Sequence, residues 1–252
     1  MVLGVFFLVA TTIFAQQLTK PSEEAAQTAR VICTMVNKYH INHGEVDDTI
    51  APKLFDRFVN LLDPQKLYFV ASDIEEFSAN RMKLDDQVKS GDVSFAYEVF
   101  NRYSDRVSER VEHAHSLVDL PHDFTADEEM TTDSEDLVWA KTQDDISERW
   151  RKRVKYEVLT FKLDGKDLKE TRDRLHKRYR TIKRSIDDTE SSEVLEMYLS
   201  SLTHCFDPHS SYMSPETLEE FRIAMQLSLD GIGAALRSED GYTFVASVVK
   251  GG

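Results

Sequence analysis

Glycine is scarce over most of this sequence, since only four of its nine glycines precede residue 231. Glycine inside a helix costs up to about 1 kcal/mol relative to alanine, so the glycine-poor part suits helices and the glycine-rich end suits turns between strands. Basic residues are also in the minority: 31 Lys and Arg against 45 Asp and Glu give a formal net charge of −14. This balance argues against nucleic acid as a partner, because neutralising phosphates needs a basic face.

Cysteine is rarer still, with only Cys33 and Cys205 in 252 residues. The two thiols would pair only in an oxidising compartment, and separate buried thiols that act as small hydrophobes are the commoner case. The sequence leaves both alternatives open.

Side-chain types that bind metals or act as nucleophiles gather at His204, Cys205, Asp207, His209 and Ser210. The proline between Asp207 and His209 forces an extended turn, and no second ligand cluster accompanies the group, so we predict no metal site and no cofactor. Neighbours in sequence rarely give the geometry of a catalytic triad, and no Gly-x-Ser-x-Gly motif is present. We assign no catalytic residue.

The N-terminal apolar stretch from Val2 to Phe14 is shorter than the roughly 20 residues that a membrane-spanning helix needs. It is followed by Ala15, a small residue at a suitable cleavage position, so residues 1–15 are predicted to be a signal peptide. No Lys or Arg precedes the apolar run, which departs from the usual pattern. The alternative is a retained anchor that leaves the protein associated with the membrane.

Helical periodicity dominates the middle of the chain. The strongest i, i+4 stripe consists of Phe95, Val99, Tyr103, Val107 and Val111. Further stripes are Ile146, Trp150, Val154, Val158 and Phe161; Leu175, Tyr179, Ile182 and Ile186; and Val194, Tyr198 and Leu202. These patterns predict a helical body of seven or eight helices that begins with a segment near residues 23–42.

Turn-forming residues predict breaks at Asp63-Pro64, Ser90–Asp92 and Asp164–Lys166, and the acidic tract Leu120–Asp136 is expected to be a mobile loop. The basic stretches 149–153 and 172–184 carry aromatic residues, as nucleic-acid faces do. Their aromatics belong to apolar stripes and acidic residues lie within pairing range, so a solvated, charge-rich face is favoured.

A short helix is predicted to begin at Ser214-Pro215-Glu216, which supplies an N-cap oxygen, a proline at the first helical position and a carboxylate in the first turn. Its apolar residues, expected to be buried, are Leu218, Phe221, Met225 and Leu229.

The residue pattern then changes from helical to strand-like at the segment Gly231-Ile232-Gly233-Ala234, which contains two glycines. Two glycines tolerate positive φ and leave the backbone bare, so successive N–H groups can converge on an anion. A peptide would add as a strand beside Ala234 to Leu236, with its last side chain in an apolar pocket. We therefore predict that Leu229, Gly231, Ile232, Gly233 and Ala234 bind a substrate's C-terminus. The alternative is an ordinary glycine-rich turn.

Three blocks carry a resemblance to a known family: Leu62–Phe69 followed by Ser72–Ile74, then Asp207–Pro215, then Met225–Ala234. In this order and spacing they resemble the tail-specific proteases, the carboxy-terminal processing serine peptidases with a Ser/Lys dyad. The resemblance covers nearly all of residues 23–252.

The resemblance implies a mainly α fold, with a helical N-terminal domain at residues 23–228 and the first strands of a truncated PDZ module at residues 229–252. Folded domains usually need at least about 50 residues, so we expect the chain to be a fragment. The family's nucleophilic Ser and the Lys that deprotonates it would lie beyond the PDZ module, so we expect the fragment itself to be inactive.

In function, the resemblance implies the N-terminal part of a periplasmic serine endopeptidase that processes or degrades proteins from their C-terminal tails. The implied partners are proteins or peptides with apolar C-termini and, as a further candidate, a periplasmic adaptor lipoprotein. A non-enzymatic periplasmic peptide-binding or adaptor module is the alternative, and a purely structural helical domain is a third.

Overall fold

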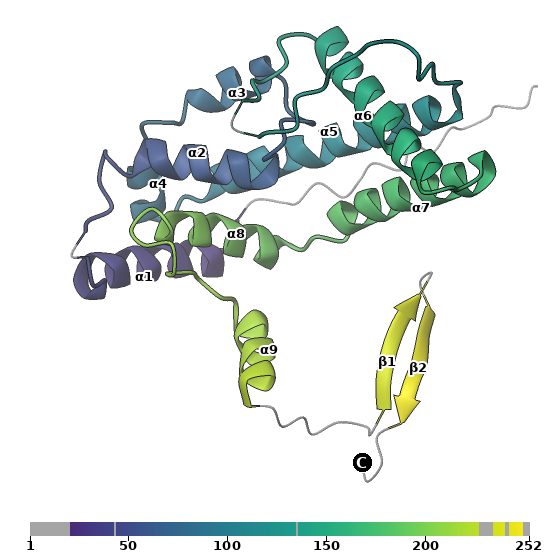
Figure 1. Ribbon diagram of the computed structural model, residues 1–252. Helices are drawn as coiled ribbons and strands as arrows, with labels where there is room; N and C mark the ends of the chain where they lie inside the picture. Colours follow the sequence, from purple (N-terminus) through teal and green to yellow (C-terminus); the bar gives the residue numbers. More distant parts are fainter. Residues whose placement is uncertain (1–20, 43, 135, 227–233, 240–241, 249–252) are drawn as a thin grey trace, which may run out of the picture. The chain divides into compact units, whose positions relative to one another are not determined.

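The computed structural model describes residues 21–42, 44–134, 136–226, 234–239 and 242–248. Within these residues it contains nine helices and a two-stranded antiparallel sheet (Figure 1). The elements are α1 (Glu23–Tyr39), α2 (Ala51–Leu62), α3 (Ala71–Ser78), α4 (Leu84–Ser90), α5 (Ser94–Asp119), α6 (Gln143–Leu163), α7 (Leu168–Asp187), α8 (Ser191–Thr203), α9 (Pro215–Gln226), β1 (Ala234–Glu239) and β2 (Tyr242–Val248). The mainly helical fold is confirmed, and the assignment of the two strands to a PDZ module stays a prediction.

The chain divides into two compact units, Met1–Tyr212 and Met213–Gly252. The first unit holds α1 to α8, and the second holds α9 and the β1–β2 hairpin. The domain boundary predicted between residues 228 and 229 lies outside the described residues and stays a prediction.

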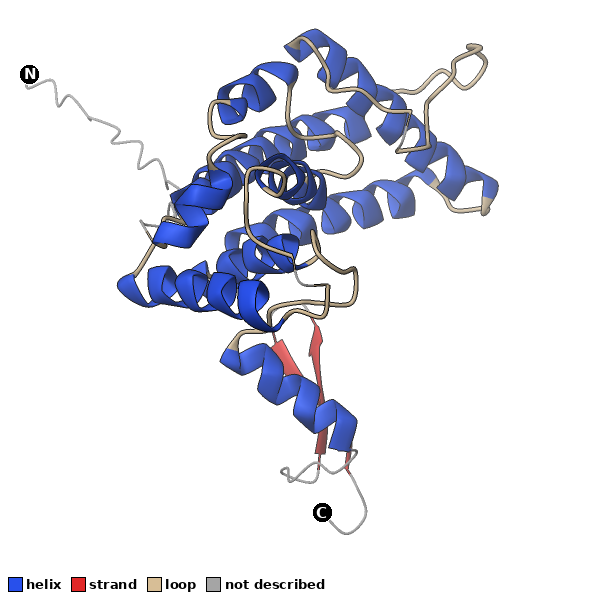
Figure 2. Cartoon of the chain, turned by 90° about the vertical axis from the view of Figure 1, so that its left-hand side faces the viewer, coloured by secondary structure: helices blue, strands red, loops and turns tan. Residues whose placement is uncertain are grey.

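The long helix α5 organises the helical unit. It packs against α2, α6, α7 and α8, while α1 packs against α4 and α8 (Figure 1). Figure 2, turned by 90°, shows the helices in blue and the two strands in red. All five residues of its predicted stripe, from Phe95 to Val111, are buried. The i, i+4 spacing places them on one face of the helix, and that face meets the neighbouring helices.

The other predicted stripes also face the core. The buried members are Ile146, Trp150, Val154, Val158, Leu175, Tyr179, Val194, Tyr198 and Leu202. Phe161, Ile182 and Ile186 are partly buried against the same core. The sequence therefore predicted which faces of α5 to α8 pack inward.

Aromatic rings link the helices through the core. The Phe58 ring on α2 meets the Tyr198 ring on α8 edge-on at 5.2 Å between centroids. The Trp150 ring on α6 lies 5.8 Å from the Tyr68 ring and 6.0 Å from the Tyr179 ring on α7. Such pairs add about 0.5–1.5 kcal/mol each beyond the buried area.

The helices end where the turn residues predicted. Gly91, at φ 89°, and Gly165, at φ 76°, follow α4 and α6 in the left-handed region that favours glycine. At the start of α6, the Thr142 hydroxyl accepts the N–H of Asp145 at 3.0 Å, and the Asp145 carboxylate accepts the N–H of Thr142 at 3.0 Å. This reciprocal capping pair satisfies two N–H groups that the helix leaves free.

The predicted break between α5 and α6 is confirmed, since no described residue from 120 to 142 is helical. Contacts at two places hold this loop against the helices. Glu128 forms ion pairs with Arg151 and Lys155 of α6, which lower the pKa of its carboxyl to about 2. Further along, the backbone N–H of Ala71 donates to the carbonyl of Ala140 at 2.8 Å, so the loop also meets the start of α3.

Candidate functional site

The predicted C-terminus-binding loop lies largely outside the described residues. This applies to Leu229, Gly231, Ile232 and Gly233, whereas Ala234 is the first residue of β1. The strand predicted from Ala234 to Leu236 is confirmed: β1 pairs antiparallel with β2, with a register irregularity between Ala235 and Leu236. The order of helix, connecting segment and strand is thus as predicted, and the role of the connecting segment stays a prediction.

The helix α9 before this loop begins as predicted. The backbone N–H of Thr217 donates to the Ser214 hydroxyl at 3.1 Å, which makes Ser214 the N-cap. The prediction that its apolar residues are buried is wrong, because Leu218, Phe221 and Met225 are 36%, 47% and 66% exposed. Periodicity identifies the apolar face of a helix, but burial also needs a second element packed against that face.

The segment that leads out of the helical unit is anchored to the end of α1. The His40 imidazole Nε2 lies 3.1 Å from the Ser210 hydroxyl, and the Asn42 amide donates to the Phe206 carbonyl at 2.8 Å. Gly44 approaches the Phe206 ring so closely that a Cβ there would lie 2.7 Å from the ring. The end of α1 thus fixes residues 206–210.

The same segment is also fixed by α8. The Ser200 hydroxyl donates to the Tyr212 carbonyl at 2.9 Å and lies 3.2 Å from the Tyr212 N–H. Within the segment, the Asp207 carboxylate accepts the N–H of His209 at 2.6 Å, which closes a tight turn. The block Asp207–Tyr212 is therefore a rigid exit from the helical unit.

The loop of residues 63–69 is built around one buried carboxylate. Asp63, 1% exposed, accepts three backbone N–H groups, from Leu67 at 2.8 Å, Tyr68 at 2.8 Å and Phe69 at 2.9 Å. Burial raises the pKa of the Asp63 carboxyl, and the three N–H donors and the charge of Arg149 offset part of that rise. The three N–H groups of this enclosed turn need an acceptor other than water, and the Asp63 carboxylate supplies it.

Side chains of helix α6 also form hydrogen bonds with the 63–69 loop. The Trp150 indole N–H donates to the Leu67 carbonyl at 2.6 Å, and the Arg149 guanidinium donates to the Lys66 carbonyl at 2.5 Å and the Val138 carbonyl at 2.9 Å. Arg149 thus joins the 63–69 loop to the segment before α6.

A second buried carboxylate organises the start of α3. Asp73, 1% exposed, accepts the N–H of Val70 at 3.1 Å and forms ion pairs with Arg102 at 2.6 Å and Arg106 at 2.8 Å, both on α5. Its carboxyl pKa is lowered, since these donors outweigh the effect of burial. The two sequence blocks Leu62–Phe69 and Ser72–Ile74 therefore serve the architecture of the helical unit.

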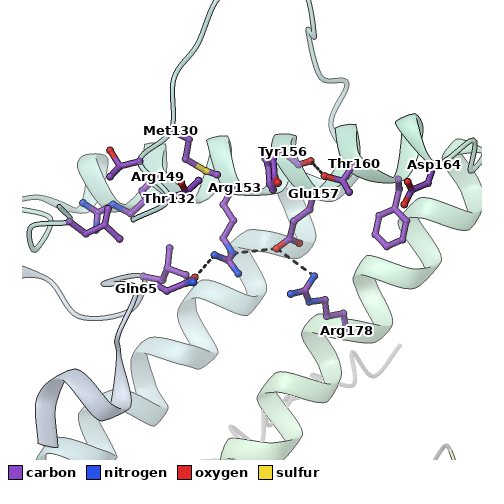
Figure 3. A pocket seen from close by; sticks show the side chains of 14 residues that line it. Gln65, Met130, Thr132, Arg149, Arg153, Tyr156, Glu157, Thr160, Asp164 and Arg178 are labelled. Carbon is purple, nitrogen blue, oxygen red and sulfur yellow. Dashed lines mark hydrogen bonds and ion pairs between the residues drawn. The ribbon is translucent and has the colours of Figure 1, made fainter. Parts of the chain in front are cut away.

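A cavity of about 500 Å³ opens between α6, α7, the 63–69 loop and residues 130–137 (Figure 3). Glu157 stands in it between Arg153 and Arg178. The Arg153 Nε lies 3.3 Å from the Glu157 Oε1, and the Arg178 Nη1 lies 3.7 Å from the same oxygen. The Tyr179 hydroxyl donates to the other oxygen, Oε2, at 2.7 Å. Together, burial and this carboxylate raise the pKa of the Tyr179 phenol.

This cavity could not be predicted from the sequence because four separated segments form it. One signal was present: Glu157 lies three residues after Val154 and four before Phe161, so it shares a face of α6 with the apolar stripe, and it is buried there. A carboxylate on a buried face needs partners from neighbouring elements, here Arg178 and Tyr179 of α7.

Residues 32–216 match the family model of the tail specific protease N-terminal domain. The chain belongs to the tail-specific protease family. The tail-specific protease of Haemophilus influenzae (strain ATCC 51907 / DSM 11121 / KW20 / Rd) is 32% identical to it over 248 residues, which is 97% of the chain. The chain spans 36% of that relative's length. The resemblance seen in the sequence is therefore confirmed, and it identifies the helical unit as the N-terminal domain of this family.

Both cysteines of this tail-specific protease chain are free thiols. Cys33 is buried, and the Cys205 thiol lies 3.2 Å from the Ser201 carbonyl. Burial raises the pKa of each thiol to about 11. Of the two alternatives, the separate thiols are confirmed.

Within the described residues, no group of three or more His, Cys, Asp or Glu side chains is placed to hold a metal ion. None of the helices in that same part of the chain has both the length and the apolar character to span a bilayer.

Arginines in the two basic stretches form ion pairs with acidic residues of the same helices. Trp150 is 1% exposed, so it is a core residue. Arg151 pairs with Glu148 at 2.7 Å, and Arg174 pairs with Glu170 at 2.7 Å. These contacts support the interpretation of a solvated, charge-rich face.

Proposed function

We propose that this chain is the N-terminal part of a periplasmic serine endopeptidase that recognises proteins by their C-terminal tails. In this proposal the helical unit is a scaffold and the segment from Leu229 to Ala234 holds the tail's terminal carboxylate as part of a PDZ module. Residues 1–15 direct export. The serine nucleophile and the lysine that deprotonates it belong to a part of the protein beyond residue 252.

The observation that carries the proposal is membership of the tail-specific protease family together with the order of elements after the helical unit. Helix α9 is followed by a connecting segment that contains Gly231 and Gly233, and then by the hairpin that begins at Ala234. A glycine-containing entry to an edge strand supports carboxylate capture by backbone N–H groups and addition of the peptide as a strand.

The rigid exit Asp207–Tyr212 supports the scaffold role. It is fixed by His40 and Asn42 at the end of α1 and by Ser200 on α8. A scaffold needs a well-ordered end of this kind, from which the chain continues to the segment proposed to hold the tail.

The second candidate is a non-enzymatic periplasmic module that holds a peptide tail, or docks a lipoprotein adaptor, without cutting. A serine and a lysine in the gene beyond residue 252 would favour the protease, and their absence would favour the adaptor.

Peptidase assays on two proteins test the proposal. The complete gene product and the 252-residue chain are each incubated with a fluorescent peptide that ends in apolar residues. We expect cleavage by the complete protein and none by the chain. Cleavage that stays with the chain through repurification would place the dyad within it, and a complete protein without activity would favour the adaptor.

A further inference from the structure

We propose that the cavity between α6 and α7 binds an amphiphilic carboxylate, an apolar acid whose carboxylate meets Arg153 and Arg178. This site is separate from the proposed tail-binding segment near Gly231. It is formed entirely by residues of the helical unit.

The charge of the cavity favours an anion. Its lining contains three arginines, Arg149, Arg153 and Arg178, against two carboxylates, Glu157 and Asp164. Arg149 donates only to backbone carbonyls, which orient it without neutralising its charge. An excess of one positive charge in a partly enclosed site attracts a ligand that carries one negative charge.

The ion pairs inside the cavity are loose. Charge-assisted N–H···O hydrogen bonds are usually about 2.7–2.9 Å long. Glu157 lies 3.3 Å from Arg153 and 3.7 Å from Arg178, and its second oxygen is taken by the Tyr179 hydroxyl. A single carboxylate shared in this way leaves guanidinium donors unused.

Arg178 has the most donors to offer. Among the described residues it makes no hydrogen bond, and its side chain is 52% exposed. Arg153 uses one nitrogen for the Gln65 side chain at 2.7 Å, which holds its guanidinium in place. Figure 3 shows the side chains of Arg153 and Arg178 both directed toward Glu157. The planar guanidinium of a single arginine can donate two parallel N–H groups to a ligand carboxylate.

Part of the remaining lining offers an apolar surface, beside the polar Gln65, Tyr156 and three threonines. Leu67, Met130, Leu137 and Phe161 contribute to the walls, and methionine adapts its shape to a ligand. The volume of about 500 Å³ lies within the range of small-molecule sites. The carboxylate has two possible sources, a free medium-chain acid or the last residues of a peptide.

Calorimetric titration of the chain tests the site with two matched ligand pairs: octanoate against octanamide, and an acetylated peptide ending in leucine against its C-terminal amide. We expect at least one acid to bind and its amide to bind at least tenfold more weakly. Arg178→Gln should weaken the same acid at least tenfold. A decade corresponds to about 1.4 kcal/mol.

Arg174→Gln is the matched control. Arg174 lies one turn before Arg178 on α7 and is 53% exposed, but it pairs with Glu170 at 2.7 Å outside the cavity lining. This variant should bind like the parent. Circular dichroism checks that both variants keep their helices.

Binding of octanoate alone identifies a free acid as the ligand, and binding of the peptide alone identifies a chain terminus. Three results overturn the proposal: neither acid binds, acids and amides bind equally, or Arg174→Gln weakens binding as much as Arg178→Gln does. Gly233→Val separates the two sites. If it removes peptide binding while Arg178→Gln leaves it intact, the peptide occupies the Gly231 segment, and the cavity proposal then rests on octanoate alone.

Discussion

Replacing Asp63 tests whether one buried carboxylate supports the 63–69 loop. Asp63→Asn keeps the size of the side chain but leaves only one acceptor oxygen. In the wild type, Oδ1 accepts from Leu67, and Oδ2 accepts from Tyr68 and Phe69. In its best orientation the amide oxygen serves Tyr68 and Phe69, and its NH₂ group then faces the N–H of Leu67.

This orientation leaves one buried N–H group without an acceptor, which costs about 1–3 kcal/mol. Asp63→Ala leaves three such groups, so its cost is at least about 3 kcal/mol at the lower end of the same range. Losses of this size matter, because a typical domain is stable by only about 5–15 kcal/mol.

Urea unfolding followed by far-UV circular dichroism at pH 7 measures both variants. The matched control is Asp56→Asn, which breaks an ion pair with Arg81. The Asp56 side chain is 51% exposed. Exposed pairs contribute about 0–1 kcal/mol, so this variant should unfold near the wild-type midpoint. If Asp63→Asn were no less stable than the Asp56→Asn control, the 63–69 loop would not depend on its carboxylate.

Gly91→Ala should lower the free energy of unfolding by more than about 1 kcal/mol, because φ is 89° and the new Cβ would lie 2.7 Å from a backbone oxygen of α1. Gly165→Ala, with φ 76° and open space around it, should cost less in the same urea titration, and equal costs would refute the steric argument. Burial and the neighbouring His176 lower the pKa of His115, so its neutral form favours folding. This stability is present above the ordinary pKa of 6.5 and is lost as pH falls below it. His115→Gln should therefore narrow the stability difference between pH 7.5 and pH 5.5, and an unchanged difference would contradict this. Intact-mass analysis of a periplasmic extract should show cleavage near Ala15, whereas a retained start methionine would indicate an anchor.

The sequence predicted the helical core because packing there follows a local rule. In α5 to α8, apolar residues recur at helical spacing, and the residues that recur are those that the structure buries, as Val107 and Tyr198 illustrate. The turns after α4 and α6 were predictable for the same reason, because they need a positive φ, which is a local property that Gly91 and Gly165 supply.

Features that depend on distant segments were not predictable in this way. The 63–69 loop needs Trp150, and the cavity needs Glu157 and Arg178 brought together by the packing of α6 on α7. The predicted burial of Phe221 was wrong because a stripe on one helix carries no information about what packs against it. The tail-binding segment was proposed from glycine chemistry and family resemblance, and its backbone geometry is outside the described residues.

Tail capture by the Gly231 segment can be tested in the complete gene product. The residues concerned are Gly231, Ile232, Gly233 and Ala234. If this segment holds the tail as proposed, Gly233→Val would place a β-branched side chain where the ligand backbone must approach, and valine is disfavoured at positive φ. It should weaken peptide binding by at least tenfold while the circular dichroism of the helical unit stays unchanged.

The most direct measurement compares two peptides that differ only at the C-terminus, one a free acid and one an amide, for binding to that complete protein. Amidation removes a charge-assisted hydrogen bond worth roughly 1.5–3 kcal/mol. We expect the amide to bind at least tenfold more weakly, since 1.4 kcal/mol is about one decade. Equal binding of the two peptides would contradict recognition of substrates by their C-terminal carboxylate.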